Sequence, residues 1–235
     1  MDFPAPVGAD NKTCGAVFRA VNNSGNTAAT GNDVTNGSTG LTFFAPHCSI
    51  VLIHNRVSLC LSQNGCFFAI DLPDDARAQI IAWRAAHFAS EDGRPVAAAN
   101  LHLTLAFLGD VSSDKQRALA QLAGRIRQPG FTLHLDDAGQ WLRSRVVWLG
   151  MRQPPRGLLQ LANMLRAQAA RSGCYQSPQP FHPHITLLRD ASHTVAIPPP
   201  GFCWSFPVTS FALYASSYGQ GRTRYAELQR WTLGE

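Results

Sequence analysis

Two four-residue strings in this chain each read histidine, apolar residue, threonine, apolar residue: His102-Leu103-Thr104-Leu105 and His184-Ile185-Thr186-Leu187. In an extended strand, successive side chains point to opposite faces, so each string places its histidine and threonine on one face and its apolar residues on the other. The apolar face can anchor the strand, while the other face presents a proton-transfer group and a hydroxyl. Because the pattern occurs twice, we expect a cleft lined by two matched His/Thr pairs.

Hydrophobic patterns and turn residues predict helices interspersed with strands in the rest of the chain. The expected strands cover residues 66–70, 101–108, 131–135, 145–149, 184–188, 206–215 and 224–231. The expected helices run from a capping Asp74 to about Phe88, from the Ser113-Asp114-Lys115-Gln116 capping box to about Ile126, and from Pro154-Pro155 to Gly173. This order is neither a run of βαβ units nor all-β, so it predicts an α+β fold with outer helices and largely antiparallel sheets.

The first 65 residues differ from the rest in composition. Between Asn22 and Gly40 the sequence consists almost wholly of Asn, Ser, Gly, Thr and Ala, with no apolar periodicity. Such a stretch cannot bury enough apolar surface to offset the entropy of ordering it. Residues 41–62 are more apolar but match neither the helical nor the alternating template for long. We therefore expect residues 1–65 to be a mostly disordered, dispensable extension and residues 66–235 to form the folded domain.

The net positive charge lies in the expected domain. Residues 66–235 contain 17 basic and 12 acidic residues, a net charge of +5, whereas the first 65 residues are neutral. Nearly all of the basic residues are arginine, whose guanidinium forms forked hydrogen bonds to phosphate. This balance favours an anionic partner and leaves nucleic acid, nucleotide and simple surface solvation all open.

The cysteines and apolar runs argue against several protein classes. The six cysteines include no CxxC pair, so neither a zinc knuckle nor a thioredoxin-type motif is expected. The N-terminus lacks a basic segment followed by an apolar core. The apolar run at residues 49–53 is far shorter than the roughly 20 residues of a membrane span. We expect a cytoplasmic protein with reduced thiols and no membrane partner.

The paired histidines suit the cleavage of a phosphodiester. An attacking water or hydroxyl must lose a proton while the leaving oxygen gains one, and histidine, with an ordinary pKa of about 6.5, can do either near neutrality. Thr104 and Thr186 lie two positions along the same strand faces and can donate hydrogen bonds to the non-bridging phosphate oxygens. No carboxylate cluster lies near the motifs in the sequence, so neither Mg²⁺ nor another metal or cofactor is expected.

Neighbouring residues leave alternatives open. His182 and His184 are two positions apart and admit a zinc interpretation, which Pro183 between them and the missing further ligands disfavour. Arg189 is a candidate phosphate clamp, although strict alternation points it away from the His184 face. Phe181 is a candidate for stacking on a base and equally for the core.

The two motifs and their flanks resemble the twin His-x-Thr-x signature of the 2H phosphoesterase superfamily. Residues Phe67–Pro73, Asn100–Gly109 and Phe181–Leu187 resemble segments of its bacterial RNA 2′,3′-cyclic phosphodiesterase branch, also called 2′-5′ RNA ligases. The similarity covers about residues 66–235. It implies a bilobal α+β fold in which two largely antiparallel sheets and outer helices surround a central pseudo-twofold cleft.

The resemblance also implies an activity, namely metal-independent hydrolysis of the 2′,3′-cyclic phosphate at an RNA end to a 2′-phosphomonoester. The reverse reaction would be an ATP-independent 2′-5′ ligation. By that analogy, His102 is the proton donor to the leaving oxygen, His184 is the proton acceptor that activates water, and Thr104 and Thr186 bind the substrate. The implied partner is RNA with 2′,3′-cyclic phosphate ends, tRNA fragments among them. A monomer is expected because one chain already contains both halves of the cleft.

Two other functions remain open from the sequence. One is a phosphodiesterase acting on a small cyclic nucleotide or an ADP-ribose cyclic phosphate, since related sites act on such substrates. The other is a non-enzymatic RNA-end-binding module that uses the histidine pairs as phosphate ligands. The second leaves two matched acid/base groups without a role, and the sequence shows no RNA-binding fingerprint such as a KH GxxG loop in context.

Overall fold

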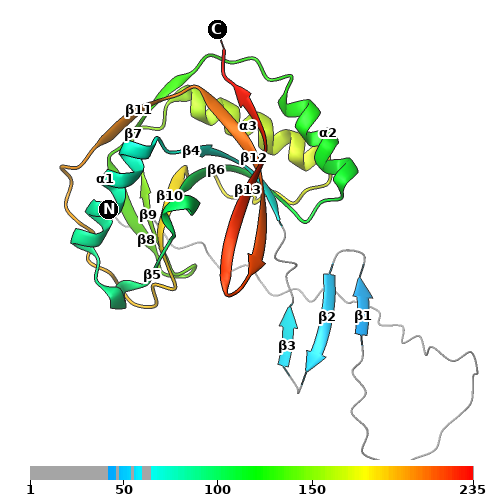
Figure 1. The fold of residues 1–235 in the computed structure, drawn as a ribbon, viewed down its shortest axis with the longest axis horizontal. Helices are drawn as coiled ribbons and strands as arrows, with labels where there is room; N and C mark the ends of the chain where they lie inside the picture. Colours follow the sequence, from blue (N-terminus) through cyan, green and yellow to red (C-terminus); the bar gives the residue numbers. More distant parts are fainter. Residues whose placement is uncertain (1–41, 46–47, 54–55, 60–64, 235) are drawn as a thin grey trace, which may run out of the picture. The chain divides into compact units, whose positions relative to one another are not determined.

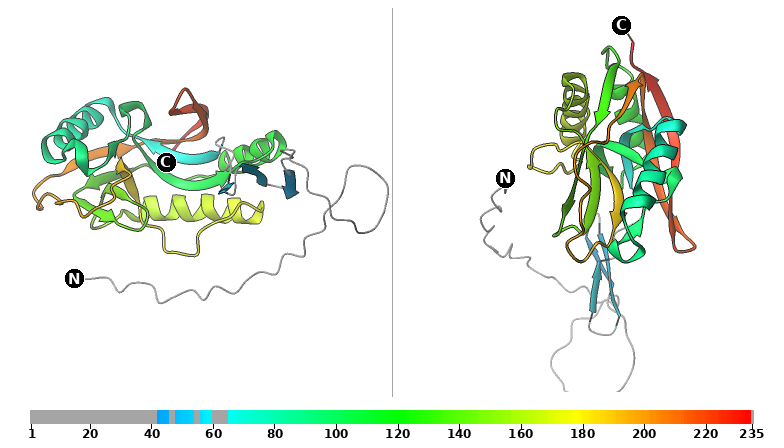
Figure 2. Two further views of the ribbon diagram at one scale, coloured as in Figure 1. Left: turned by 90° about the horizontal axis from the view of Figure 1, so that it is seen from below. Right: turned by 90° about the vertical axis from the view of Figure 1, so that its left-hand side faces the viewer.

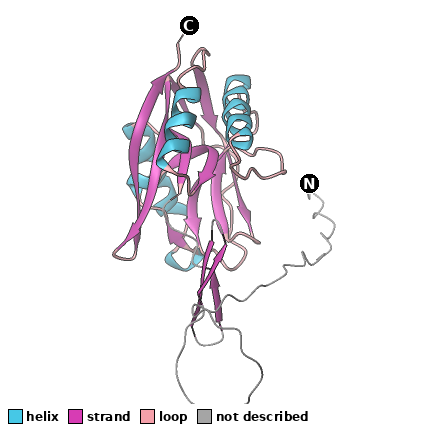
Figure 3. Cartoon of the chain, turned by 90° about the vertical axis from the view of Figure 1, so that its right-hand side faces the viewer, coloured by secondary structure: helices cyan, strands magenta, loops and turns pink. Residues whose placement is uncertain are grey.

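The computed structural model describes residues 42–45, 48–53, 56–59 and 65–234, and its main body is an antiparallel sheet with helices on its outside (Figures 1 and 3). The strands of this sheet are β4 (Cys66–Asp71), β5 (Arg94–Pro95), β6 (His102–Gly109), β8 (Asp137–Trp141), β9 (Val146–Gly150), β10 (His184–Arg189), β12 (Ser210–Gly219) and β13 (Arg222–Thr232). Their order across the sheet is β13-β12-β4-β6-β10-β9-β8, with β5 beside β10. The expected α+β class with antiparallel sheets is confirmed.

The sheet consists of two halves that meet between β6 and β10. In the part of the chain that the structure describes, these two strands share one registered pair, Leu103 with Ile185, and run antiparallel. A pair of antiparallel strands has a local twofold axis perpendicular to the sheet. The two His-x-Thr strings are therefore related by an approximate twofold axis through this seam, because each histidine directly precedes a residue of the pair.

Among residues 65–234, three α-helices cover the sheet and two strands form a small separate ribbon. The helices are α1 (Asp74–His87), α2 (Ser113–Ala123) and α3 (Arg156–Arg171), and the ribbon pairs β7 (Phe131–Leu135) with β11 (Trp204–Val208). Figure 2 shows α3 on the opposite side of the strands from α1. The buried face of α3 packs on β6. Each fully buried leucine on it contributes about 1.5–3 kcal/mol. The members of that face are Leu158, Leu161, Ala162, Leu165 and Ala169.

The helix starts differ from the predicted caps by one residue. The N-cap of α1 is Pro73, without a side-chain cap, and the expected cap Asp74 is the first helical residue. The N-cap of α2 is Ser112 rather than Ser113, because the Ser112 hydroxyl accepts a hydrogen bond from the Lys115 N–H. In both places two adjacent residues have cap chemistry or turn geometry, which the sequence pattern alone does not separate.

Some strands also differ from their prediction. The expected strand at 206–215 is two strands, since the chain leaves the small ribbon after Val208 and joins the main sheet at Ser210. Strand β8 was not expected, because its residues are all half-buried and show no alternation. Strand β5 lies within what was expected to be a connector at residues 94–100.

The predicted disorder of residues 1–65 falls mainly on residues outside the described ones and stays a prediction. Where that stretch is described, it contains three short strands that pair antiparallel in the order β1-β2-β3. These strands are β1 (Thr42–Ala45), β2 (Cys48–Ile53) and β3 (Arg56–Leu59). The sequence pattern predicts no element there.

Candidate active site

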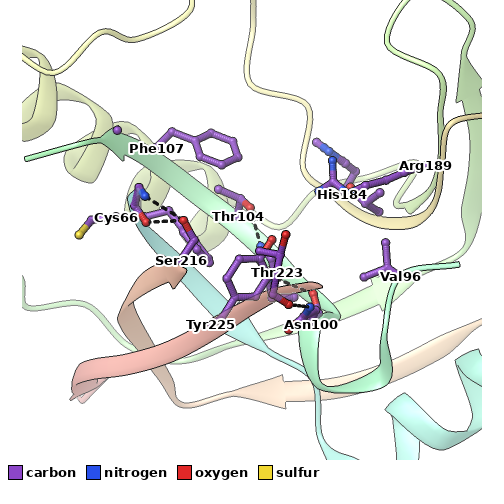
Figure 4. Close-up of a pocket in the computed structure, with 15 residues that line it drawn as sticks. Cys66, Val96, Asn100, Thr104, Phe107, His184, Arg189, Ser216, Thr223 and Tyr225 are labelled. Atoms are coloured by element: carbon purple, nitrogen blue, oxygen red, sulfur yellow. Dashed lines mark hydrogen bonds between the residues drawn. The ribbon is translucent and has the colours of Figure 1, made fainter. Parts of the chain in front are cut away.

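The seam between β6 and β10 brings the four predicted site residues together. Leu103 and Ile185, paired across the seam, are 1% and 0% exposed and point into the core. The residues on either side of this pair therefore point to the opposite face, where they line a cavity of about 220 Å³ (Figure 4). The motif residues in that lining are His102, Thr104, His184 and Thr186.

Both histidine rings are held by a backbone carbonyl two residues earlier in the chain. Nδ1 of His102 donates to the carbonyl oxygen of Asn100, and Nδ1 of His184 donates to that of His182, each at 2.8 Å. Because Nδ1 carries the proton in this arrangement, Nε2 is left as the nitrogen that accepts or delivers a proton. The Thr104 hydroxyl lies 3.0 Å from Nε2 of His102 and donates to it when that ring is neutral.

A β-bulge in each strand brings one further side chain into the cavity. In β10 the register shifts between Thr186 and Leu188, so Leu187 and Leu188 are both buried and the alternation reverses. Arg189 therefore lies on the same face as His184 and lines the cavity, which strict alternation did not predict. In β6, Leu105 and Ala106 are likewise both buried, and Phe107, five residues after His102, lines the cavity as Arg189 does.

Aromatic rings fix the position of His102. Its ring stacks on Phe67 at a centroid distance of 4.8 Å and meets Tyr225 edge-on at 5.2 Å. Phe67 in turn stacks on Tyr214 at 5.6 Å, and the Tyr214 hydroxyl donates to the Asp71 carboxylate at 2.6 Å. The ring of His102 is thus packed on two sides by side chains from β4 and β13.

A second aromatic cluster packs against His184. Trp141 on β8 meets the His184 ring edge-on at 4.6 Å, and Trp148 on β9 lies 5.5 Å from Trp141. The His182 ring packs edge-on against Trp148 at 4.7 Å. A Cβ atom at Gly139 would lie 2.4 Å from Trp148, so this position of β8 needs glycine to admit the indole.

Burial lowers the pKa of both histidines. It lowers the pKa of His102 from its ordinary 6.5 to about 4, and the hydrogen bond to Asn100 and the charge of Asp71 offset only part of this effect. The pKa of His184 is also lowered, first by burial and then by the neighbouring His182 and Arg189. Both rings are therefore neutral at pH 7 in the free enzyme, and a bound anion would raise both pKa values.

Apart from Arg189 and Phe107, the cavity residues outside the two motifs come from distant strands and loops, and their types are common in ordinary packing. Three of them, Phe67, Asn100 and Gly109, lie in the flanking segments on which the family resemblance rests. The whole set is Gly65, Cys66, Phe67, Val96, Asn100, Gly109, Ser216, Thr223 and Tyr225. Phe181, left open between base stacking and the core, packs against the core and lies outside this lining.

The described residues add no third ligand that would support a zinc site at His182 and His184. The two rings lie 6.2 Å apart, and the described residues contain no group of three or more His, Cys, Asp or Glu side chains arranged to hold a metal ion. Among the same residues, no helix is long and apolar enough to cross a membrane.

The chain is similar to known proteins over most of its length. A family model described as the 2′-5′ RNA ligase superfamily matches residues 72–215, a range that contains both His-x-Thr strings. The chain is 77% identical over 167 residues to the RNA 2′,3′-cyclic phosphodiesterase of Escherichia coli, covering 71% of this chain and 95% of that protein. It is 30% identical over 180 residues to the protein of that name from Thermus thermophilus, covering 71% and 89%.

Solved structures give the same result. The crystal structure of E. coli LigT complexed with 3′-AMP matches with a TM-score of 0.71 and 75% identity, covering 73% of this chain and 99% of that chain. The structure of TT0787 from T. thermophilus matches with a TM-score of 0.63 and 28% identity, covering 72% and 97%.

Proposed function

The chain belongs to the 2′-5′ RNA ligase superfamily, and we propose that it hydrolyses 2′,3′-cyclic phosphates at RNA ends to 2′-phosphomonoesters without a metal. The observation that carries the proposal is the twofold placement of two identically held histidines in one cavity. A site that must take one proton and give another needs two such groups on either side of one phosphorus.

In the proposed reaction, water attacks the phosphorus in line with the bond to the 3′-oxygen. Nε2 of His184 takes the proton of the attacking water, and Nε2 of His102 gives a proton to the departing 3′-oxygen. The bond from phosphorus to water forms as the bond to the 3′-oxygen breaks, which leaves the phosphate on the 2′-oxygen. Each proton transfer contributes typically 10²–10⁴-fold to the rate.

Hydroxyl and guanidinium groups in the cavity stabilise the phosphate. Thr104, whose hydroxyl faces Nε2 of His102, donates to a non-bridging oxygen once His102 is protonated, and Thr186 occupies the matching place beside His184. Arg189 adds a positive charge with forked donors. The phosphate anion raises the pKa of His102, so that the proton donor is charged when substrate is bound.

The same site supports a ligation. If the 5′-hydroxyl of a second RNA replaces water, His184 takes its proton, His102 protonates the departing 3′-oxygen, and a 2′-5′ linkage forms without ATP. In the reverse of this ligation the 3′-hydroxyl attacks the linkage and the two histidines exchange roles, which their approximate symmetry favours.

We also propose that the enzyme acts as a cytoplasmic monomer on RNA fragments, including those of tRNA. One chain supplies both halves of the cavity, so no partner is needed to complete it. A mass from light scattering equal to one chain supports the monomer, and a stable dimer mass contradicts it.

The test is turnover in EDTA of an oligonucleotide that ends in a 2′,3′-cyclic phosphate, with a small cyclic nucleotide as a second substrate. We expect the RNA end to be hydrolysed to a 2′-phosphate, and His102→Ala and His184→Ala each to lower kcat at least 10²-fold while the protein stays folded. Full activity of either variant, or loss of wild-type activity in EDTA, contradicts the mechanism. If only the small cyclic nucleotide is hydrolysed, the proposal that RNA ends are the substrate is wrong.

A further inference from the structure

We propose that the outer part of the β12–β13 hairpin is an RNA-binding arm, which holds the nucleotides directly 5′ of the cyclic phosphate. The RNA-contacting residue of this arm is Tyr218. This inference rests on the proposed function and adds to it a preference for RNA ends over mononucleotides.

The arm continues the wall of the cavity. Thr223 and Tyr225 line the cavity, and Tyr225 contacts the ring of His102. Tyr218 pairs directly with Thr223 across the hairpin, so its side chain lies on the same face as these two residues. Each two-residue step along a strand covers about 6.8 Å, so Tyr218 extends this face outward from the reacting phosphate. The hairpin is anchored there, because the Asn100 side-chain amide donates to the Thr223 carbonyl at 2.9 Å.

The Tyr218 ring is available to a ligand. Its side chain is 52% exposed, and a Cβ atom at Gly219 or Gly221, on either side of the tip, would have no heavy atom within 4 Å. Proteins that bind single-stranded RNA stack successive bases on such exposed aromatic rings beside a positively charged groove.

Two exposed arginines lie on the other face of the hairpin. Arg222 and Arg224 alternate with Thr223 and Tyr225 along β13, so their side chains point away from the face that carries Tyr218. In the described part of the chain neither guanidinium makes an ion pair, whereas Arg230 on the same strand is paired with Asp71 and Glu227. The two arginines therefore allow the charge of the hairpin to be tested separately from the Tyr218 face.

The first experiment compares two substrates in the full-length enzyme: adenosine 2′,3′-cyclic phosphate and an RNA octamer with a 2′,3′-cyclic phosphate end. We expect Tyr218→Ala to raise the KM for the octamer at least fivefold, the lower end of what one base–aromatic stack provides. The kcat for the octamer and the kinetics on the mononucleotide should stay within twofold of the unaltered enzyme.

The second experiment removes the two arginines from the opposite face of the hairpin. Arg222→Ala/Arg224→Ala should leave the octamer KM and kcat within twofold of the unaltered enzyme, because neither side chain faces the proposed RNA path.

This double variant is the matched control for charge. A rise in the octamer KM equal to that of Tyr218→Ala means that net charge, not the aromatic ring, holds the RNA, and overturns the proposal.

Two further outcomes also overturn it. One is that Tyr218→Ala changes octamer and mononucleotide kinetics equally, and the other is that it changes neither. If the unaltered protein hydrolyses neither substrate, the proposed function itself fails and the arm fails with it, so the two failures are distinguishable.

Discussion

His102 and His184 each donate their Nδ1 proton to a backbone carbonyl, so at the scale of single residues both rings are prepared in the same tautomer. What distinguishes them is the surroundings. His102 stacks on Phe67 close to the carboxylate of Asp71, whereas His184 meets the indole of Trp141 and lies near Arg189. The assignment of donor and acceptor must therefore rest on these neighbours and on experiment, because the motif is the same in both strands.

The lowered pKa values predict an acidic optimum for kcat/KM. This parameter reports the free enzyme, in which one histidine must be protonated and the other neutral. Because both pKa values lie below 6.5, the bell-shaped profile should have its maximum below pH 6.5 and fall as the pH rises further. Initial rates at low substrate concentration from pH 4 to 9 check this, and a maximum above pH 7 contradicts it.

The same pKa shift predicts acid sensitivity of the fold. The pKa of His102 is about 4 in the folded protein and about 6.5 in the unfolded chain, so below pH 6.5 the unfolded chain binds a proton that the folded protein does not. The stability is therefore complete above pH 6.5 and is lost as the pH falls towards 4. Between pH 7.5 and 4.5 we expect His102 to account for a loss of about 2–3 kcal/mol.

Urea unfolding at the two pH values measures this loss. His102→Asn should show a drop in unfolding free energy that is smaller by about 2–3 kcal/mol than that of the unaltered protein. Equal drops in both proteins would mean that the pKa of His102 is not depressed.

At the scale of elements, both the success and the failure of the sequence prediction follow from strand periodicity. Alternation correctly placed His184 and Thr186 on one face, but it placed Arg189 on the wrong one. The bulge at Leu187 and Leu188 that reverses the alternation has no marker in the sequence, since two adjacent leucines also fit a strand buried on both faces.

Strand β8 shows why other parts of the site could not be predicted. Its residues are half-buried throughout and contain Gly139, a residue that is unfavourable in strands. The reason for the glycine lies in another strand, since Trp148 of β9 occupies the space of its missing side chain. No sequence pattern marks Trp141, and the structure shows that it packs against His184.

Gly139→Ala should therefore impair both stability and turnover. The new methyl group would force Trp148 to move, and overpacking of this kind costs typically 1–3 kcal/mol. Trp148 contacts Trp141, which contacts His184, so we expect a lower kcat as well as a lower Tm. Gly234→Ala is the matched control, because its Cβ would meet nothing within 4 Å. An unchanged kcat in Gly139→Ala would show that the tryptophan cluster does not position His184.

At the scale of the whole molecule, the cavity is assembled from residues far apart in the chain, from Gly65 to Tyr225. The sequence indicated the two central strands, because the motifs are local signals, while the limits of the domain stay a prediction from composition. Which other strands flank the seam depends on long-range pairing, such as β12 with β4, which leaves no local pattern.

Removal of residues 1–64 should leave turnover of a cyclic phosphate and the Tm unchanged. The cavity-lining residues of the described structure lie at or beyond Gly65, whose N–H donates to the Ser216 hydroxyl at 2.8 Å. The truncated protein therefore keeps every residue of the described cavity lining. An unfolded or inactive truncated protein would contradict the proposal that the extension is dispensable.

The central claim is that the two histidines perform opposite proton transfers in one cavity. The most direct test replaces the leaving 3′-oxygen of the cyclic phosphate by sulfur, because a thiolate leaves without the proton that an alcohol oxygen needs. With this substrate we predict that His102→Ala recovers most of its lost rate, while His184→Ala stays inactive because the water still needs a base. Rescue of His184→Ala alone would reverse the two roles, and equal rescue of both variants or of neither would contradict the claim.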